Sequence, residues 1–85
     1  MALGVVEKLA ESLERARYLV AFELIVAAQA VDLRGLAPDL LGTGPRRAYG
    51  QVRRLVPMLD HDRPLGPDAE RIAAALASGA FADAR

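Results

Sequence analysis

The sequence predicts an all-α fold, with one long bundle helix followed by a linker and two short helices. Apolar residues recur at steps of three or four from Val6 to Val31, which is the pattern of one face of an α-helix. All five prolines fall in two stretches, 35–45 and 57–67, which separate this helix from two shorter segments. The 85 residues allow at most one small domain with a marginal core of its own.

The first helix is expected over residues 3–33. Its first half is amphipathic, because charged residues occupy the other faces of the apolar stripe. Glu11 and Arg15 form a favourable pair four residues apart. Arg34 and Gly35 mark the end of the helix.

A linker over residues 34–44 leads to the second helix, which is expected over 45–56. Thr43 or Gly44 can cap this helix, with Pro45 in the first helical position that proline favours. The helix should stop at residue 55 or 56, because Pro57 disfavours helical geometry in the residue before it.

A proline-rich corner is expected over residues 57–66, and the third helix over 67–78. Asp68 and Glu70 lie in the first turn of this helix, where negative charge complements the helix dipole. Gly79 follows the last turn and supplies the terminator that helices commonly use.

The most informative segment is 18–31, YLVAFELIVAAQAV, in which Glu23 and Gln29 are the clearly polar residues. A helix that is apolar on all sides must be buried on all sides. The segment is too short and too interrupted for a membrane span of about 20 apolar residues. Two short helices cannot cover every face of a third. We therefore expect the chain to be part of a larger helical assembly.

Composition excludes several classes of protein. Eleven basic and eleven acidic residues balance, so no overall field draws the chain to nucleic acid or to a membrane surface. There is no cysteine, which excludes disulfides and thiolate metal sites and is compatible with a cytoplasmic location. The amino terminus has no basic region before an apolar run, so it does not resemble a signal peptide.

The chain's single histidine is His61, between Asp60 and Asp62. These three residues could hold a metal ion, but neighbours on an extended loop point in alternating directions, and a dedicated site needs three or four convergent ligands. We expect a solvated loop and no metal site.

Four arginines of the second helix are spaced as two pairs seven residues apart: Arg46, Arg47, Arg53 and Arg54. A basic stripe in a three-helix chain raises the possibility of DNA binding. The neutral net charge and the apolar first helix argue against it. A solvated face or a face of intersubunit salt bridges is the favoured interpretation.

Glu23 lies among apolar neighbours, and Leu19 and Ala27 occupy the positions one turn before and after it. A buried carboxylate is costly unless it is paired or protonated. Glu23 is therefore either a structural ion-pair partner or a tuned acid that faces a site. Gln29 is expected to be a buried hydrogen-bonding spacer.

Two motifs together resemble a known family. The first helix carries A-x-E-L-x-x-A-x-Q-x-x-D-x-R, and the corner carries V-P…D-R-P-L-x-P-D. The matching residues are Ala21, Glu23, Leu24, Ala27, Gln29, Asp32 and Arg34, then Val56, Pro57, Asp62, Arg63, Pro64, Leu65, Pro67 and Asp68. This order and spacing is similar to the C-terminal region of the histidine and aromatic amino-acid ammonia-lyases, over nearly the whole chain.

The resemblance implies a helical homotetrameric enzyme that removes ammonia with a methylidene-imidazolone group. That group is made from an Ala-Ser-Gly triad far upstream of this region. Ala77-Ser78-Gly79 is a coincidence in that light and marks a helix end. Tyr18 and Tyr49 do not match the catalytic tyrosine. The resemblance therefore implies no catalytic, cofactor-binding or metal residue in this chain.

The corner is expected to be structural. Pro64 and Pro67 fix two φ angles and stiffen the chain. Arg63, next to Asp62, can bind a carboxylate of a helix beneath it through two nitrogens. Asp68 starts the last helix. We expect Glu23 to be held by an arginine from elsewhere, with Arg63 as the first candidate.

The favoured function is a helical subunit or fragment of such a lyase, which completes the helical bundle and is inactive alone. Its partners would be further copies of itself, a larger N-terminal lyase polypeptide, or both. One alternative is an autonomous interaction module that self-associates through the first helix. A second is a small nucleic-acid binder that uses the arginine stripe.

Overall fold

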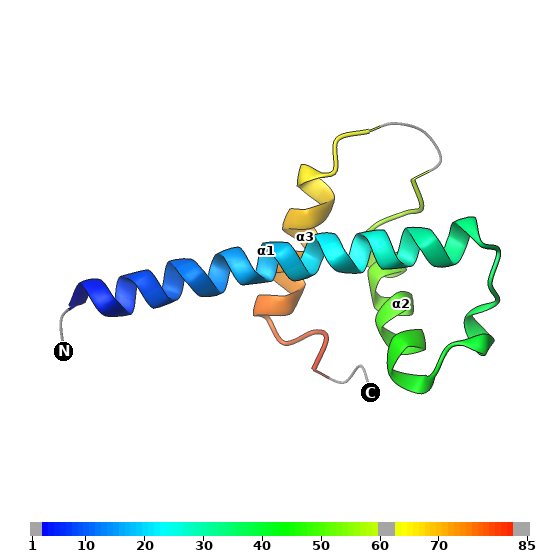
Figure 1. Cartoon of the computed structure of the whole chain (residues 1–85), viewed down its shortest axis with the longest axis horizontal. Helices are drawn as coiled ribbons and strands as arrows, with labels where there is room; N and C mark the ends of the chain where they lie inside the picture. Colours follow the sequence, from blue (N-terminus) through cyan, green and yellow to red (C-terminus); the bar gives the residue numbers. More distant parts are fainter. Residues whose placement is uncertain (1–2, 60–62, 83–85) are drawn as a thin grey trace.

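The structure is a computed structural model that describes residues 3–59 and 63–82. It consists of α1 (Leu3–Leu33), a 3₁₀ turn η1 (Pro38–Leu40), α2 (Thr43–Leu55) and α3 (Gly66–Ala77). The long α1 runs along the length of a flat molecule that measures 50 × 30 × 16 Å; α3 crosses α1 near its middle, and α2 lies at a steep angle to its second half (Figure 1). The predicted all-α class is confirmed.

A glycine ends α1 by a defined hydrogen-bond pattern. Gly35 has φ +64°, a conformation that side-chain-bearing residues rarely adopt. Its N–H donates to the carbonyl of Asp32 over 3.0 Å, and the N–H of Leu36 donates to the carbonyl of Val31 over 3.2 Å. These two bonds make a Schellman motif, which satisfies the last carbonyls of the helix and turns the chain back.

The second helix begins earlier than the sequence indicated. α2 starts at Thr43, two residues before Pro45, and the residue that precedes it is Gly42. The expectation that Thr43 or Gly44 caps the helix is therefore wrong. The carbonyl of Gly42 already accepts the N–H of Arg46 over 2.9 Å. Proline is tolerated inside the first turn, because the N–H groups there have no partner within the helix.

The third helix runs from Gly66 to Ala77, one residue earlier at each end than expected. Gly79 has φ +82°, and it ends α3 as Gly35 ends α1. Its N–H donates to Leu76, and the N–H of Ala80 donates to Ala75. The hydroxyl of Ser78 donates to the carbonyl of Ala75 over 2.9 Å. Ala77-Ser78-Gly79 is thus the end of a helix, as predicted.

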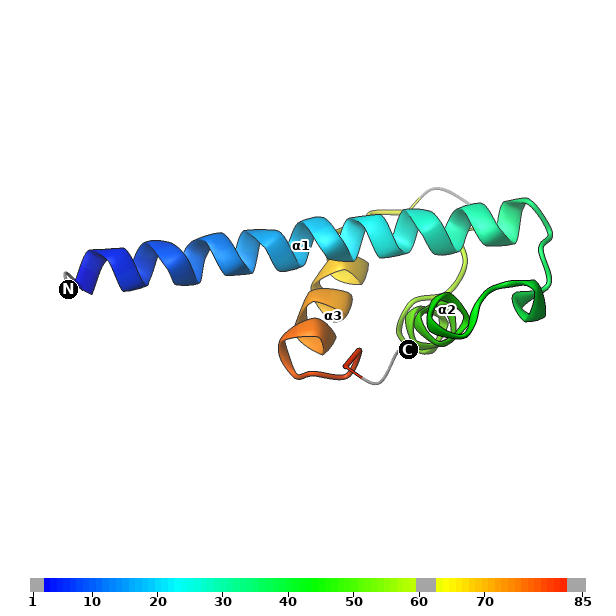
Figure 2. The same ribbon diagram turned by 60° about the horizontal axis from the view of Figure 1, so that its bottom comes forward.

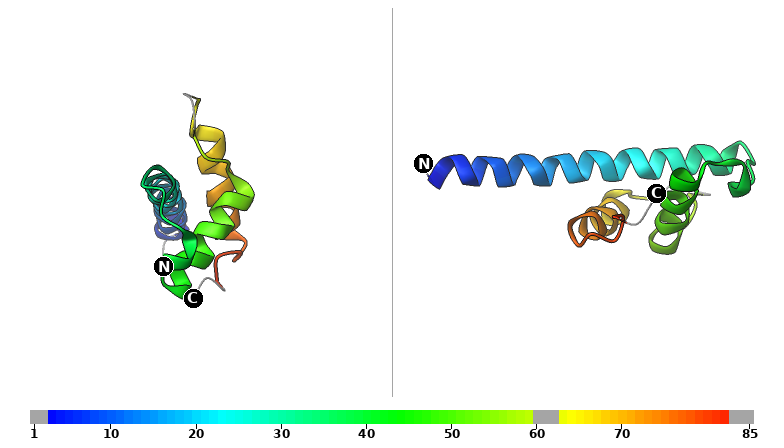
Figure 3. Two further views of the ribbon diagram at one scale, coloured as in Figure 1. Left: turned by 90° about the vertical axis from the view of Figure 1, so that its right-hand side faces the viewer. Right: turned by 90° about the horizontal axis from the view of Figure 1, so that it is seen from below.

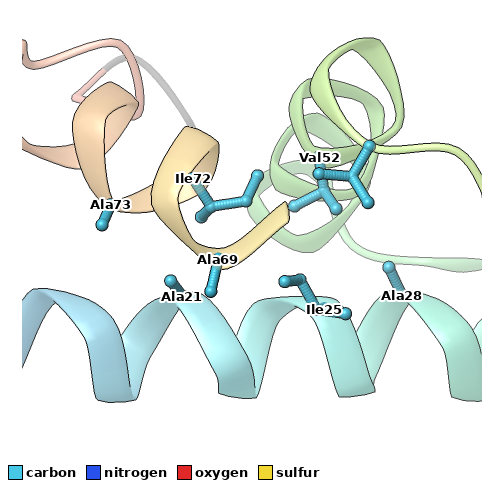
Figure 4. Packing of buried hydrophobic residues seen from close by; sticks show 8 residues of the cluster. Ala21, Ile25, Ala28, Val52, Ala69, Ile72 and Ala73 are labelled. Atoms are coloured by element: carbon cyan, nitrogen blue, oxygen red, sulfur yellow. The ribbon is translucent and has the colours of Figure 1, made fainter. Parts of the chain in front are cut away.

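The core is small and consists mainly of short side chains. α1 supplies Ala21, Ile25 and Ala28, and their side chains face those of α2 and α3 (Figure 4). The largest fully buried side chains are Ile72, Val52 and Val56. Alanines on the facing surfaces let the helices approach closely, so α3 can cross the middle of α1 while α2 packs near its end.

Both short helices lie on the same side of α1, and the opposite side has no neighbour among residues 3–59 and 63–82 (Figure 3). The first half of α1 also extends beyond α3 (Figure 2). Many large apolar side chains of α1 are therefore exposed: Leu3, Val5, Val6, Leu9, Leu13, Leu19, Val20, Phe22, Val26 and Leu33. Even so, no helix in the described part of the chain is long and apolar enough to span a membrane.

Candidate functional site

The outer side of α1, which faces away from α2 and α3, is an uncovered apolar surface. Leu19 is 66% exposed and Val26 is 64% exposed. A shallow hollow of about 350 Å³ lies on this side, lined by Phe22, Val26, Ala27 and Ala30 together with Glu23. Burying such side chains yields roughly 1.5–3 kcal/mol each, so this surface favours a partner.

Glu23 lies on this outer surface and is exposed, whereas the sequence predicted a buried carboxylate. That expectation is wrong for the single chain, because α2 and α3 both pack on the other side of α1. Within residues 3–59 and 63–82, Glu23 makes no ion pair or hydrogen bond. Any need for a cation beside Glu23 arises when its apolar neighbours are covered.

Arg63 binds Asp68, so the predicted pairing of Arg63 with Glu23 is wrong within the chain. Nε and Nη2 of Arg63 donate to Oδ2 of Asp68 over 3.2 and 3.0 Å. The same guanidinium donates to the backbone carbonyls of Pro57 and Met58 over 2.8 and 3.2 Å. Arg63 thereby joins both ends of the proline-rich corner, with Pro64 and Pro67 between its two attachment points.

Asp68 is the one buried charged residue among those described, at 4% exposure. Arg71 donates to its other oxygen, Oδ1, over 3.2 Å. Two guanidinium groups thus satisfy a carboxylate that would otherwise be costly to bury. The sequence predicted only a charge that complements the helix dipole. Asp62, Asp60 and His61 lie outside the described residues.

Gln29 holds the segment after α2 against α1. Its Nε2 donates to the carbonyl of Leu59 over 2.8 Å, and its Oε1 accepts the N–H of Leu59 over 3.1 Å. The amide side chain therefore pairs with both backbone groups of one residue, as a neighbouring strand would. This is the hydrogen-bonding role that the sequence predicted for Gln29.

A third polar cluster joins the end of α1 to α2 and was not predicted. Nε of Arg53 donates to Oδ2 of Asp32 over 2.8 Å, and the hydroxyl of Tyr49 donates to Oδ1 of the same carboxylate. The Arg53 guanidinium also lies 5.7 Å from the centre of the Tyr49 ring. The hydrogen bond to Asp32 is the main cause that raises the pKa of Tyr49 above 10.0, with desolvation second.

The arginine stripe is broken by this cluster. Arg53 is turned inward and its side chain is 17% exposed, whereas Arg46, Arg47 and Arg54 are exposed. The expectation that all four arginines form one surface stripe is therefore wrong. The signal that could have shown this is Asp32, an acid at the end of an apolar helix with no cation one turn before it.

These polar clusters connect the helices and the segments between them. In the described part of the chain, no group of three or more histidine, cysteine or acidic residues could hold a metal ion. A hollow of about 190 Å³ between α1 and α2 is lined almost entirely by apolar side chains, among them Leu24, Val31 and Pro45. The polar side chains hold helices together, and the surface left over is apolar.

Comparison with known proteins gives one consistent group of relatives. A histidine ammonia-lyase of Sorangium cellulosum is 43% identical over 74 residues, which are 87% of this chain and 14% of that protein. A histidine ammonia-lyase of Stigmatella aurantiaca is 40% identical over 68 residues, 80% of this chain and 13% of that protein. The chain belongs to the histidine ammonia-lyase family and corresponds to one segment of such an enzyme.

The histidine ammonia-lyase family also includes a relative with a different activity in its name. A MIO-dependent tyrosine 2,3-aminomutase of Streptomyces globisporus is 44% identical over 63 residues, 74% of this chain and 12% of that protein. No family model and no solved structure matches the chain. The chain spans only 12–14% of the length of these relatives.

Proposed function

We propose that the chain is the C-terminal helical segment of an ammonia-lyase, with a structural and assembly role and no catalytic residue of its own. The methylidene-imidazolone group would lie in another part of the enzyme. The proposal includes a cytoplasmic location, which a chain without cysteine fits. The partners would be a larger lyase polypeptide and further copies of the same segment.

One observation carries this proposal: the polar side chains of the corner and of the helix ends bind one another, while no other described segment of the chain covers the apolar outer side of α1. Arg63, Gln29 and Arg53 each fix a connection between helices. Leu19 and Val26 remain more than half exposed. Soluble monomers seldom expose continuous apolar surfaces of this kind. The segment also occurs in both a lyase and an aminomutase, which fits a role common to two reactions.

Complementation tests the proposal. The matching segment is deleted from the Sorangium cellulosum histidine ammonia-lyase, and the truncated enzyme is produced with and without this chain. We expect the chain to copurify with the truncated enzyme and to restore most of its ammonia release, whereas the chain alone forms no unsaturated acid. A chain with Leu19→Asp and Val26→Asp, which keeps the core, is the matched control and should not restore it. Turnover by the chain alone would contradict the proposal.

The nucleic-acid alternative loses its main support. The binding stripe needed four outward-facing arginines, and Arg53 is committed to Asp32 and Tyr49. The other alternative, an autonomous module that self-associates through its first helix, would use the same outer side of α1 as the proposed lyase segment. The complementation experiment separates the two, because an autonomous module would not restore the truncated enzyme.

A further inference from the structure

The outer side of α1 carries a seam with coiled-coil spacing. Its first half presents Val5, Leu9, Ser12 and Ala16, and its second half presents Leu19, Glu23, Val26 and Ala30. These residues follow one another at alternating steps of four and three, which is the spacing of the a and d positions in a heptad repeat. All of them are exposed, because the core of the chain lies on the opposite side of the helix.

We propose that this seam pairs with the seam of a second copy of the chain, antiparallel, with the symmetry centre between Arg17 and Tyr18. This inference rests on the proposed assembly role, and it specifies a second copy of the chain as a partner of the outer side of α1. In this register Ser12 of each copy lies opposite Glu23 of the other. The dimer therefore contains two equivalent Ser12–Glu23 pairs, which join the only two polar residues of the seam. The remaining positions pair apolar with apolar.

Size complementarity supports the same register. Val5 and Leu9 of one copy come opposite Ala30 and Val26 of the other. The hollow of about 350 Å³ lies at this end of the seam, where Ala27 and Ala30 leave space. Val5 of one copy can fill the space that Ala30 leaves in the other. At the centre, Leu19 of one copy likewise lies opposite the small side chain of Ala16 in the other.

The charges exclude the parallel arrangement. Parallel pairing in register would bring Glu23 against Glu23 of the second copy, and like charges in an apolar seam are destabilising. In the antiparallel register, Arg15 lies three residues from the point opposite Glu23, about 4.5 Å along the axis at 1.5 Å per residue. An arginine side chain spans that distance. The second copy thus supplies the cation that Glu23 lacks among the described residues of its own chain.

Neighbouring antiparallel registers fit less well. A shift by one heptad places Glu23 opposite Leu19 or opposite Val5, so a carboxylate meets a branched apolar side chain in both copies. A polar residue at a single seam position is a known device that fixes register and partner number. Ser12 and Glu23 together would serve that purpose here.

Cysteine crosslinking tests the register, because the chain has no cysteine of its own. One variant carries Val5→Cys, and a second variant, made with a different mass, carries Ala30→Cys. The two variants are mixed, unfolded, refolded together and oxidised, so that mixed and self-crosslinked dimers are distinguished by mass. We expect the mixed disulfide in at least tenfold excess over either self-crosslink. In the antiparallel pair, Val5 of one copy lies about 37 Å from Val5 of the other, and a disulfide needs Cα atoms within about 7 Å.

The matched control replaces Ala30→Cys by Leu19→Cys, which lies 11 residues, or about 16 Å, away from the point opposite Val5. This control should give at least tenfold less mixed disulfide. A second pair, Leu9→Cys with Val26→Cys, repeats the test with two other exposed positions, and helical content by circular dichroism verifies that each variant folds. Self-crosslinks in excess, equal crosslinking in the control, or no mixed product from either folded pair would overturn the proposal.

The outcome is separable from that of the proposed function. A chain that restores the truncated lyase but gives no mixed disulfide would keep the assembly role and remove the self-pairing. A chain that crosslinks as expected but never joins the truncated lyase would keep the pairing and remove the lyase role.

Discussion

At the scale of single residues, the polar side chains divide by what they fix. Arg63 fixes the corner, Gln29 the segment after α2, and Asp32 the junction between α1 and α2. The sequence indicated the stiff corner and the role of Gln29, since a polar residue in an apolar helix needs a partner. It could not show the partner of Arg63, because several carboxylates stand at comparable distances along the chain and the approach of the helices decides among them.

Removing Arg63 should destabilise the chain more than removing Arg71, although both bind Asp68. We expect Arg63→Leu to lower the free energy of unfolding by about 2–3 kcal/mol, because it leaves a buried carboxylate without its main cation. Arg71 is 57% exposed, so Arg71→Leu should cost less than about 1 kcal/mol. Urea titration of each variant measures both values. Equal losses of unfolding free energy in the two variants would show that Arg63 stabilises Asp68 no more than Arg71 does.

The corrected partner of Arg63 has a second consequence. Glu23→Gln and Arg63→Leu affect groups that do not touch, so their costs should add within about 0.5 kcal/mol in the double variant. Asp68→Asn with Arg63→Leu should instead cost clearly less than the two single changes together. Additivity in this second combination would contradict the Arg63–Asp68 contact.

Tyr49 should make stability depend on alkaline pH. Its pKa is raised above 10.0 in the folded chain, chiefly by the hydrogen bond to Asp32, so the folded state holds the phenolic proton more tightly than the unfolded state. The resulting stabilisation is fully present below pH 10 and is lost as pH rises through the folded pKa. Tyr49→Phe should cost about 1 kcal/mol at pH 7 and progressively less above pH 10.

Unfolding midpoints between pH 7 and 11.5 measure this effect. Tyr18→Phe, the same change at the chain's other tyrosine, is the control. If the deficit of Tyr49→Phe stayed constant to pH 11.5, the hydrogen bond to Asp32 would not account for the raised pKa.

At the scale of elements, the long helix was the most predictable part and the start of α2 the least. A stripe that repeats over about seven turns contains enough signal to place α1 at Leu3–Leu33. Gly42, Thr43, Gly44 and Pro45 each suit the start of a helix for a different reason, so the sequence alone could not choose between them. The short turn η1, Pro38–Leu40, has no periodicity and was missed.

Glycine substitutions should separate helix ends from helix interiors. Gly35→Ala should lower stability by about 1 kcal/mol, because alanine is strained at φ +64°. Gly50→Ala is the matched control within α2 and should raise stability by roughly 0.5–1 kcal/mol. An added Cβ meets nothing within 4 Å at either position, so both effects are conformational. Thermal unfolding midpoints should move in opposite directions, and a shift in the same direction would contradict this account.

At the scale of the whole molecule, the sequence indicated a chain that cannot bury its own first helix, and the structure shows which side remains uncovered. Segment 18–31 is apolar on all sides, but α2 and α3 both pack on the side of Ala21 and Ile25. Periodicity could not predict this choice, because every face of the segment is apolar. Small residues do not distinguish the two sides either, because Ala21 and Ala28 lie on the packed side while Ala27 and Ala30 lie on the outer side.

This uncovered side should make the stability of the isolated chain depend on its concentration. When folding is coupled to dimerisation, the free energy of unfolding per dimer rises by about 1.4 kcal/mol for each tenfold increase in protein concentration. We therefore expect the thermal unfolding midpoint to rise when the protein concentration is increased on the order of a hundredfold, from about 5 to about 500 μM.

Leu19→Lys should abolish this dependence on concentration, because it places a charge in the middle of the outer surface of α1. Leu40→Lys introduces the same charge on η1, where the side chain is 76% exposed and lies off that surface, and should leave the dependence unchanged. A 9.1 kDa monomer by sedimentation, with a midpoint independent of concentration, would mean that the exposed face of α1 is tolerated in water without a partner.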